Sequence, residues 1–226
     1  MPEHDDVSDL NMSHFEELRR RINARLREIG ATHARRQIEE FPWLYGALGE
    51  VPSRAMLICE NPSLGGVEKA NRHTIRAGGP SIEDQWCGNP KGNCIKRLRP
   101  ALYEAGLRTK RPQEPGGWRC YITNVIKEAD RVKDFAERDK YSPARQWADI
   151  LAWEFEQVQP TILFTLGGSA TELVTWLQAH GHIPSSPKPR RVVHYSDRGR
   201  NATDENVRTQ MLEAFRAGLA ATPSFR

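Results

Sequence analysis

Several features of membrane and secreted proteins are missing from this chain. None of its apolar runs approaches the ~20 residues that a helix needs to span a bilayer. Its N-terminus, MPEHDDVSDL, lacks the basic-then-apolar layout of a secretory signal. Cysteine is scarce, with four residues in 226, and without a secretory signal we expect reduced thiols rather than a disulfide framework. The composition therefore predicts a cytoplasmic, globular protein.

Internal repeats and low-complexity tracts are also absent from the sequence. A length of 226 residues corresponds to one domain, because domains usually have about 100–200 residues. A fold of this size buries roughly 70% or more of the surface of its unfolded chain. Its core therefore needs no metal or disulfide for stability.

Acidic side chains are in deficit over most of the chain. The first ten residues hold four of the 29 acidic residues and no Lys or Arg, which leaves 33 basic against 25 acidic residues. The basic residues cluster at 19–21, 96–99, 108–111, 188–191 and 198–200. Such an excess favours a polyanionic partner. An ordinary solvated basic face has the same composition, and composition alone leaves both readings open.

Four short apolar runs alternate with stretches of helical periodicity. Each run is uninterrupted, as is typical of strands buried on both faces, and they cover 55–59, 120–123, 161–164 and 191–194. Helices are predicted over about 93–107, from 142, from a capping box at Ser169 and Glu172, and over about 207–219. This alternation predicts a three-layer α/β/α sandwich with a central, mostly parallel four-stranded sheet.

The N-terminal region has its own helical pattern. Ser13 and Glu16 form a second capping box, and apolar residues then recur at helical spacing until Gly30. We expect this apolar stripe to pack on the main body. The chain thus divides into an acidic flexible tail (1–12), an N-terminal helical segment packing on the core (13–50) and the α/β domain (51–226).

Polar residues follow each predicted strand. They are Glu60, Asn61 and Ser63 after the first, Asn124 at the end of the second, Gly167-Gly168-Ser169 after the third, and His194-Tyr195-Ser196 at the fourth. The carboxyl ends of parallel strands meet at one edge, where open α/β sheets place ligands. Two long connections, 61–91 and 127–142, leave the same edge. Taken singly, each of these residues also has an ordinary structural explanation. Glu60 could be a surface acid, Asn124 a strand cap and His194 a core histidine.

Four segments, in order and spacing, resemble the motifs of the uracil-DNA glycosylase superfamily. They are Cys59-Glu60-Asn61-Pro62-Ser63, Ile122-Thr123-Asn124-Val125-Ile126-Lys127, Leu166-Gly167-Gly168-Ser169-Ala170 and His194-Tyr195-Ser196, and the resemblance spans roughly residues 54–220. Cys59 and Ser63 replace glycines common in the first motif, and Tyr195 replaces the proline of a closing H-P-S. Some relatives carry an iron–sulfur cluster, but the cysteine spacings here do not fit it, and we predict no metal or organic cofactor.

The resemblance implies roles for individual residues. Enzymes that act on a base first extract it from the stack. Trp86 lies where relatives have the aromatic that stacks on this base, and Asn124 where they have the amide that reads its edge. Glu60 or Asn61 would orient the attacking water, with Glu60 favoured, and His194 would stabilise the departing base.

Contacts to the DNA backbone are expected from hydroxyls, basic side chains and a helix start. The candidates are Ser63, Lys127, Gly168, Ser169, Ser196, Arg198 and Arg200. The segment 197–200 lies where relatives insert an apolar wedge into the duplex, and here an arginine would have to fill that place.

The resemblance implies a monomeric, monofunctional DNA glycosylase that excises uracil, or a related deaminated base, and leaves an abasic site for base excision repair. Since Ser63 is smaller than the tyrosine with which some relatives exclude thymine, we hypothesise a pocket that is less strict about 5-substituents on the base or about other deaminated bases. Its partner would be single- or double-stranded DNA and not a membrane, with nucleoid association in a bacterium. A damaged-DNA binding protein with little or no turnover, and a nucleotide- or phosphate-ester-handling α/β enzyme, are the alternatives.

Overall fold

A computed structural model describes residues 6–29, 48–62, 92–128, 141–199 and 202–221, with side chains from residue 13 onward. Its centre is a five-stranded sheet in the order β1-β3-β2-β4-β5. The strands are β1 (Leu48–Gly49), β2 (Ala55–Cys59), β3 (Tyr121–Asn124), β4 (Ile162–Leu166) and β5 (Pro189–Val192). All neighbouring strands pair in parallel except β1 and β3, which are antiparallel.

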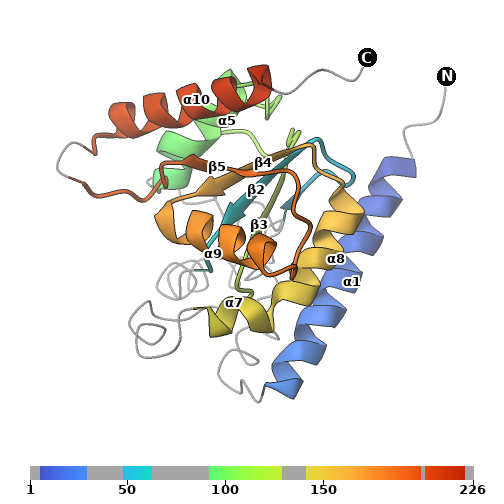
Figure 1. Ribbon diagram of the computed structural model, residues 1–226. Helices are drawn as coiled ribbons and strands as arrows, with labels where there is room; N and C mark the ends of the chain where they lie inside the picture. Colours follow the sequence, from blue (N-terminus) through green and yellow to red (C-terminus); the bar gives the residue numbers. More distant parts are fainter. Residues whose placement is uncertain (1–5, 30–47, 63–91, 129–140, 200–201, 222–226) are drawn as a thin grey trace.

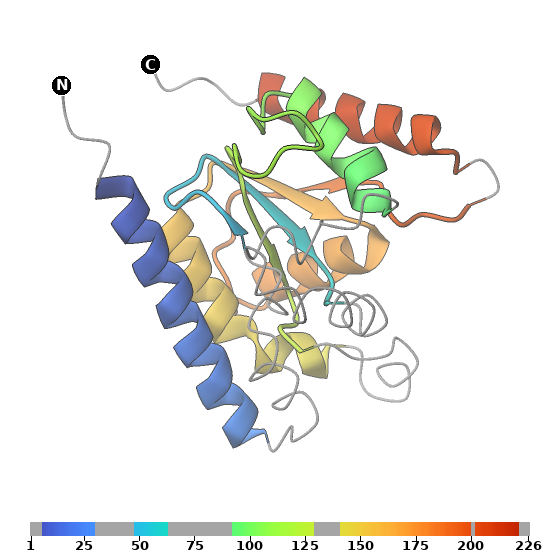
Figure 2. The same ribbon diagram turned by 180° about the vertical axis from the view of Figure 1, so that it is seen from behind.

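Helices cover both faces of the sheet (Figure 1). One face carries α1 (Asp6–Glu28), α7 (Ser142–Gln146), α8 (Ala148–Val158) and α9 (Gly168–Ala179). The other carries the π-helical turn η3 (Cys94–Leu98), α5 (Arg99–Glu104) and α10 (Asp204–Ala220), and Figure 2 shows the same layering from behind. The predicted three-layer α/β/α architecture is confirmed.

Strand β2 shows why two helical layers are required. Its five residues are all buried. Met56 and Ile58 point into the core under α1, α8 and α9, whereas Leu57 and Cys59 point into the core under α5 and α10. Because successive side chains of a strand face opposite sides, an uninterrupted apolar run needs cover on both.

The sheet has one strand more than predicted. Strand β1 contains only two residues, which is too short for any periodicity to reveal it. Its Gly49 has φ +117°, and a Cβ built there would lie 2.0 Å from the carbonyl oxygen of Cys120. Glycine therefore permits the close approach of this antiparallel edge strand to the chain before β3.

The N-terminal helix begins earlier than predicted. Helix α1 starts at Asp6, so residues 6–12 are helical rather than part of a tail, and Ser13 lies inside the helix instead of capping it. Farther along, Leu18, Ile22 and Leu26 are buried in the same core as α8, as their spacing predicts.

The cysteines correct one expectation. Cys59 and Cys120 are buried free thiols, and burial raises the pKa of Cys59 to about 12, so this thiol stays protonated. Cys94 is disulfide-bonded, so the expectation of four reduced cysteines is wrong. That expectation came from the missing secretory signal, whereas disulfide formation depends on a second sulfur within reach. Among the described helices, none has both the length and the hydropathy of a membrane span.

Substituting Gly49 with alanine should destabilise the protein strongly. The new Cβ would clash with backbone rather than with a flexible side chain. Gly106 is a matched control, since its φ is +77° and a Cβ there meets nothing within 4 Å. We expect Gly106→Ala to cost about 1 kcal/mol of unfolding free energy and Gly49→Ala at least about 3 kcal/mol in urea denaturation. Equal costs would show that β1 does not depend on this close approach.

Candidate active site

The carboxyl ends of the central strands stop at a common level. Cys59 of β2 lies opposite Asn124 of β3, and Ile58 lies opposite Thr165 of β4. In the next pair of strands along the sheet, Leu166 of β4 lies opposite Val192 of β5. The residues just beyond these positions therefore lie at one rim of the sheet, and they include Glu60, Asn61, Gly167 and His194.

Backbone hydrogen bonds continue past the ends of β2 and β3. The N–H of Val125 donates to the carbonyl of Cys59 at 2.9 Å, and the N–H of Ile126 donates to the carbonyl of Glu60 at 2.9 Å. Asn124 is 3% exposed, and Asn61, which is half-buried, donates from Nδ2 to the carbonyl of Pro62 at 3.2 Å. Glu60 and Asn124 are thus held in adjacent, rigidly paired segments.

Glu60 is linked to the start of helix α9. Its carboxylate is half-buried, and burial raises its pKa, while a hydrogen bond from the Ser169 side chain opposes this rise. The predicted capping box at Ser169 and Glu172 is wrong. The cap of α9 is Gly167, which makes no side-chain capping bond, and Ser169 lies inside the first turn. The Ser169 hydroxyl bonds to Glu60 instead.

Gly167 lies against His194. It has φ +93°, a conformation that favours glycine, and a Cβ there would be in ordinary van der Waals contact with the Cβ of His194, at 3.4 Å. The N–H of Gly167 donates to the carbonyl of Val192 at 2.8 Å, which joins the start of α9 to the end of β5. Strand β5 ends at Val192, so His194 follows the strand rather than belonging to it as predicted over 191–194. The shift places the imidazole in the rim.

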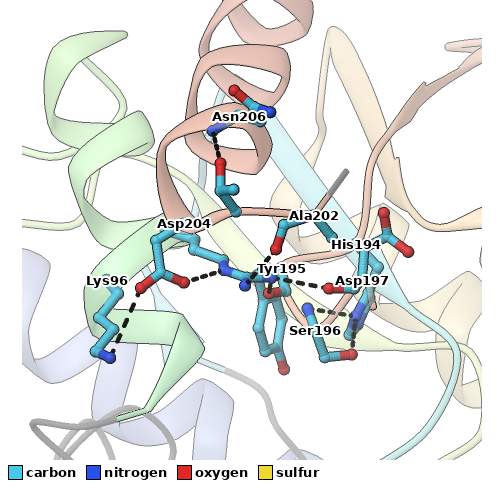
Figure 3. Close-up of polar contacts among 10 residues, drawn as sticks. Lys96, His194, Tyr195, Ser196, Asp197, Ala202, Asp204 and Asn206 are labelled. Atoms are coloured by element: carbon cyan, nitrogen blue, oxygen red, sulfur yellow. Dashed lines mark hydrogen bonds and ion pairs between the residues drawn. The ribbon is translucent and has the colours of Figure 1, made fainter. Parts of the chain in front are cut away.

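His194 is held in one tautomer. The backbone N–H of Ser196 donates to Nδ1 of His194 at 3.1 Å, and the Ser196 hydroxyl lies 2.6 Å from the same nitrogen (Figure 3). A backbone N–H can only donate, so Nδ1 accepts and the ring proton is on Nε2. Burial lowers the pKa of His194 below 6.5, with a smaller opposing effect from Asp197, so the ring is neutral at pH 7. It stacks on Tyr195 with centroids 4.3 Å apart.

Lys127 is not a surface residue, and its predicted contact with the DNA backbone is wrong. Its side chain is fully buried, and Nζ contacts the carboxylate of Glu154 and the hydroxyl of Thr123, the latter at 2.6 Å. Glu154 also accepts hydrogen bonds from the hydroxyls of Tyr121 and Thr123, each at 2.7 Å. The ammonium is enclosed by these partners, so it cannot reach a phosphate, and it secures the segment after β3 to helix α8.

The remaining predicted residues divide into two groups. Gly168, Ser169, Ser196 and Arg198 are exposed, near the ends of β4 and β5. Trp86, Ser63 and Arg200 lie outside the described residues, so their roles stay predictions. Within the basic clusters, Arg97, Arg99 and Arg108 are buried, so these side chains do not form part of a surface for a polyanion.

Two residues that shape the site were missed by sequence reasoning. Glu154 is the only acid on the buried stripe of α8, which also includes Ile150, Leu151, Phe155 and Val158, and a charge at such a position is a usable signal for a buried ion pair. Arg97 gave no such signal, because its partners are distant in sequence. In the described part of the chain, no group of three or more His, Cys, Asp or Glu is placed to hold a metal ion.

An α/β/α fold with a carboxylate, two amides and a neutral imidazole at the carboxyl edge of its sheet defines a class of α/β enzyme whose site lies on strand-end loops. The family model for the uracil DNA glycosylase superfamily matches residues 47–216, so the chain belongs to this superfamily. Membership makes it one of a family of DNA glycosylases, hydrolases of DNA repair that act on DNA. The sequence matches none of the curated proteins.

Replacing Lys127 with methionine should destabilise the protein by about 3–5 kcal/mol, because Glu154 would remain buried without its cation. Lys188 is exposed, and Lys188→Met should change the unfolding free energy by less than about 0.5 kcal/mol. Both are measured by urea denaturation. A loss no larger for Lys127→Met than for Lys188→Met would contradict the structural role assigned to this ion pair.

Proposed function

We propose that this protein is a monofunctional DNA glycosylase that hydrolyses the N-glycosidic bond of uracil, or of a related deaminated base, in DNA and leaves an abasic site. The observation that carries the proposal is that His194, just past β5, lies at the same rim of the sheet as Glu60 and Asn124, with Nδ1 of the imidazole engaged by the Ser196 N–H. In this arrangement, the Nε2–H is the donor left for a substrate.

His194 would act on the leaving group. Cleavage of the C–N bond builds negative charge on the departing base, and a preorganised donor stabilises that charge in the transition state more than in the ground state. The neutral His194 ring has one N–H, on Nε2, which would donate to O2 of the base. A neutral imidazole donates without adding a proton to the base, so the base would depart as an anion.

Asn124 would read the base. Its side-chain amide has a donor and an acceptor, which complement O4 and N3–H of uracil. Cytosine presents the reversed pattern and would leave both amide groups mismatched, which is costly at a site that is 3% exposed. The backbone pairing of Cys59 with Val125 keeps this amide in register with the first motif.

Glu60 would orient the attacking water and steady the positive charge that develops on the sugar. The hydrogen bond from Ser169 favours the ionised carboxylate, which is the form this role requires. Asn61 is the other candidate, and the bond from its Nδ2 to Pro62 supports a local structural role for it. We therefore assign the water to Glu60.

Strand cleavage by a lyase step would need an amine nucleophile. The amine of Lys127 cannot serve as this nucleophile, because it is enclosed by Glu154.

DNA phosphates would be bound around the start of α9 and along the loop after His194. Gly168, Ser169, Ser196 and Arg198 are the described candidates, and Ser63 and Arg200 complete the proposed set. The guanidinium of Arg191 lies 3.6 Å from where a Cβ on Gly168 would be, which adds positive charge at this helix start. We expect the protein to act as a monomer.

Glycosylase activity is tested with labelled single- and double-stranded oligonucleotides that contain uracil, hypoxanthine or xanthine, followed by alkaline cleavage of abasic sites. We expect strand breaks only after alkali. His194→Ala and Glu60→Gln should each lower the single-turnover rate by about 100-fold or more, since each removes a transition-state contact. His180→Ala, at an exposed histidine of the α9 terminus, is the control and should leave the rate unchanged.

Other results point to the alternatives. Tight binding of damaged DNA without product from any of the three bases would favour a binding protein. Binding of free nucleotides with no affinity for DNA would favour a nucleotide-handling enzyme. Cleavage that survives unchanged in Glu60→Gln would remove the water assignment but leave the glycosylase class intact.

The rate should depend on pH through both groups in the same direction. His194 has a pKa below 6.5 and is active as the neutral ring, and Glu60 has a raised pKa and is active when ionised. Protonation of either group removes activity, so the single-turnover rate should be highest at neutral to slightly alkaline pH and fall as the solution becomes acidic. NMR titration of His194 gives its pKa independently. A rate that rises as His194 is protonated would contradict the neutral-imidazole mechanism.

A further inference from the structure

Arg97, in the π-helical turn η3, sends a buried guanidinium into the loop that follows His194. The residue is 7% exposed. Nη1 donates to the carbonyls of Tyr195 and Asp197 at 3.1 and 2.9 Å, and Nη2 donates to the carbonyl of Ala202 at 3.1 Å (Figure 3). Nε donates to the carboxylate of Asp204 at 2.7 Å. One side chain therefore satisfies four acceptors.

These acceptors lie at both ends of the loop. Tyr195 and Asp197 come directly after His194, and Ala202 precedes helix α10. Asp204 is the first residue of α10, whose cap is Thr203 through a bond from the N–H of Asn206 at 3.1 Å. Arg97 thus ties the catalytic end of the loop to the fixed start of a helix.

The charge and shape of arginine suit this position. Asp204 neutralises the buried guanidinium, and Arg97 is the main cause that lowers the pKa of Asp204. Carbonyl oxygens on several sides of one group require donors in a fixed planar fork, which an ammonium cannot provide. A surface role in binding phosphate does not fit, because the guanidinium is directed into the protein.

Ser196 connects the turn that Arg97 holds with the imidazole of His194. Ser196 stands between the two residues whose carbonyls Arg97 holds, and its N–H and hydroxyl contact Nδ1 of His194. The N–H of Asp197 also donates to the carbonyl of His194 at 2.9 Å, which closes the turn. A shift of this turn would move the Ser196 N–H off the imidazole and release the ring from its tautomer and orientation.

We propose that Arg97 is a positioning residue for His194, acting through the Tyr195–Asp197 turn. Its effect on the reaction rests on the proposed glycosylase function, whereas its effect on the turn and on the imidazole does not. Arg97 would lower the barrier by keeping the Nε2–H aimed at the substrate, without touching DNA itself.

The experiment compares Arg97→Lys with Lys96→Met. Lys96 is the matched control, because its Nζ lies 3.6 Å from the same Asp204 carboxylate but is exposed. We expect Arg97→Lys to lower the single-turnover rate on uracil-containing DNA by about 10–100-fold, as misplacement of a catalytic group does, with less than about threefold change in DNA affinity. Lys96→Met should leave the rate unchanged.

A double-mutant cycle tests the route of this effect. In a His194→Ala background, Arg97→Lys should lower the rate by less than about twofold, because the group that it positions is gone. If the two effects multiply, Arg97 acts independently of His194 and the proposal is wrong.

Two measurements do not depend on glycosylase activity. In Arg97→Lys, the amides of Ser196 and Asp197 should lose hydrogen-exchange protection, and the pKa of His194 should move toward 6.5 with both tautomers populated in NMR spectra. Asp204→Asn keeps the guanidinium and removes its charge partner, so it should give a smaller change of the same kind and serves if Arg97→Lys does not fold. If the variant that folds keeps wild-type hydrogen-exchange protection at Ser196 and Asp197 and the wild-type titration of His194, the proposal is wrong. If these quantities change but the wild-type protein has no glycosylase activity, the positioning role of Arg97 is upheld and the proposed function is rejected.

Discussion

The common end level of the parallel strands is the constraint on which the site depends. Strand β2 pairs with both β3 and β4, so the backbone after Cys59 and the side chain of Asn124 are brought to one rim. The hydrogen bonds from Val125 and Ile126 extend this pairing beyond the strands themselves. A slip of one residue in the pairing of β3 with β2 would turn Asn124 to the opposite face. The chemistry therefore relies on backbone register before it relies on any side chain.

Buried charges hold the segments that leave this rim. Lys127 and Glu154 join the segment after β3 to α8, and Arg97 joins the loop after His194 to α10. Each cation is enclosed by acceptors, as desolvated charges must be. A buried charge with several hydrogen bonds specifies one conformation for each of these segments, because any other conformation would leave the charge or its acceptors unpaired. Part of the basic excess of this chain thus belongs to the interior and not to a DNA-binding surface.

Much of the fold and of the rim could be predicted from local patterns. The buried runs before Glu60 and Asn124 have no polar alternation, which marks central parallel strands, and Gly167 marks the turn into α9. The predictions failed where a local pattern had more than one structural use. Ser169 resembles a helix cap, yet its hydroxyl bonds to Glu60, and Lys127 resembles a surface cation, yet it is enclosed by Glu154.

Apolar periodicity and motif spacing are properties of neighbouring residues, so the layered α/β architecture, the order of the strand-end motifs and their family can be predicted from the chain alone. Three features come from the folded molecule instead: the edge strand at Gly49, the ion pair of Lys127 with Glu154, and the hydrogen bonds of Arg97 to the carbonyls beside His194. These contacts join residues far apart in the chain. Their partners are selected by the packing of helices on the sheet, which no local pattern encodes.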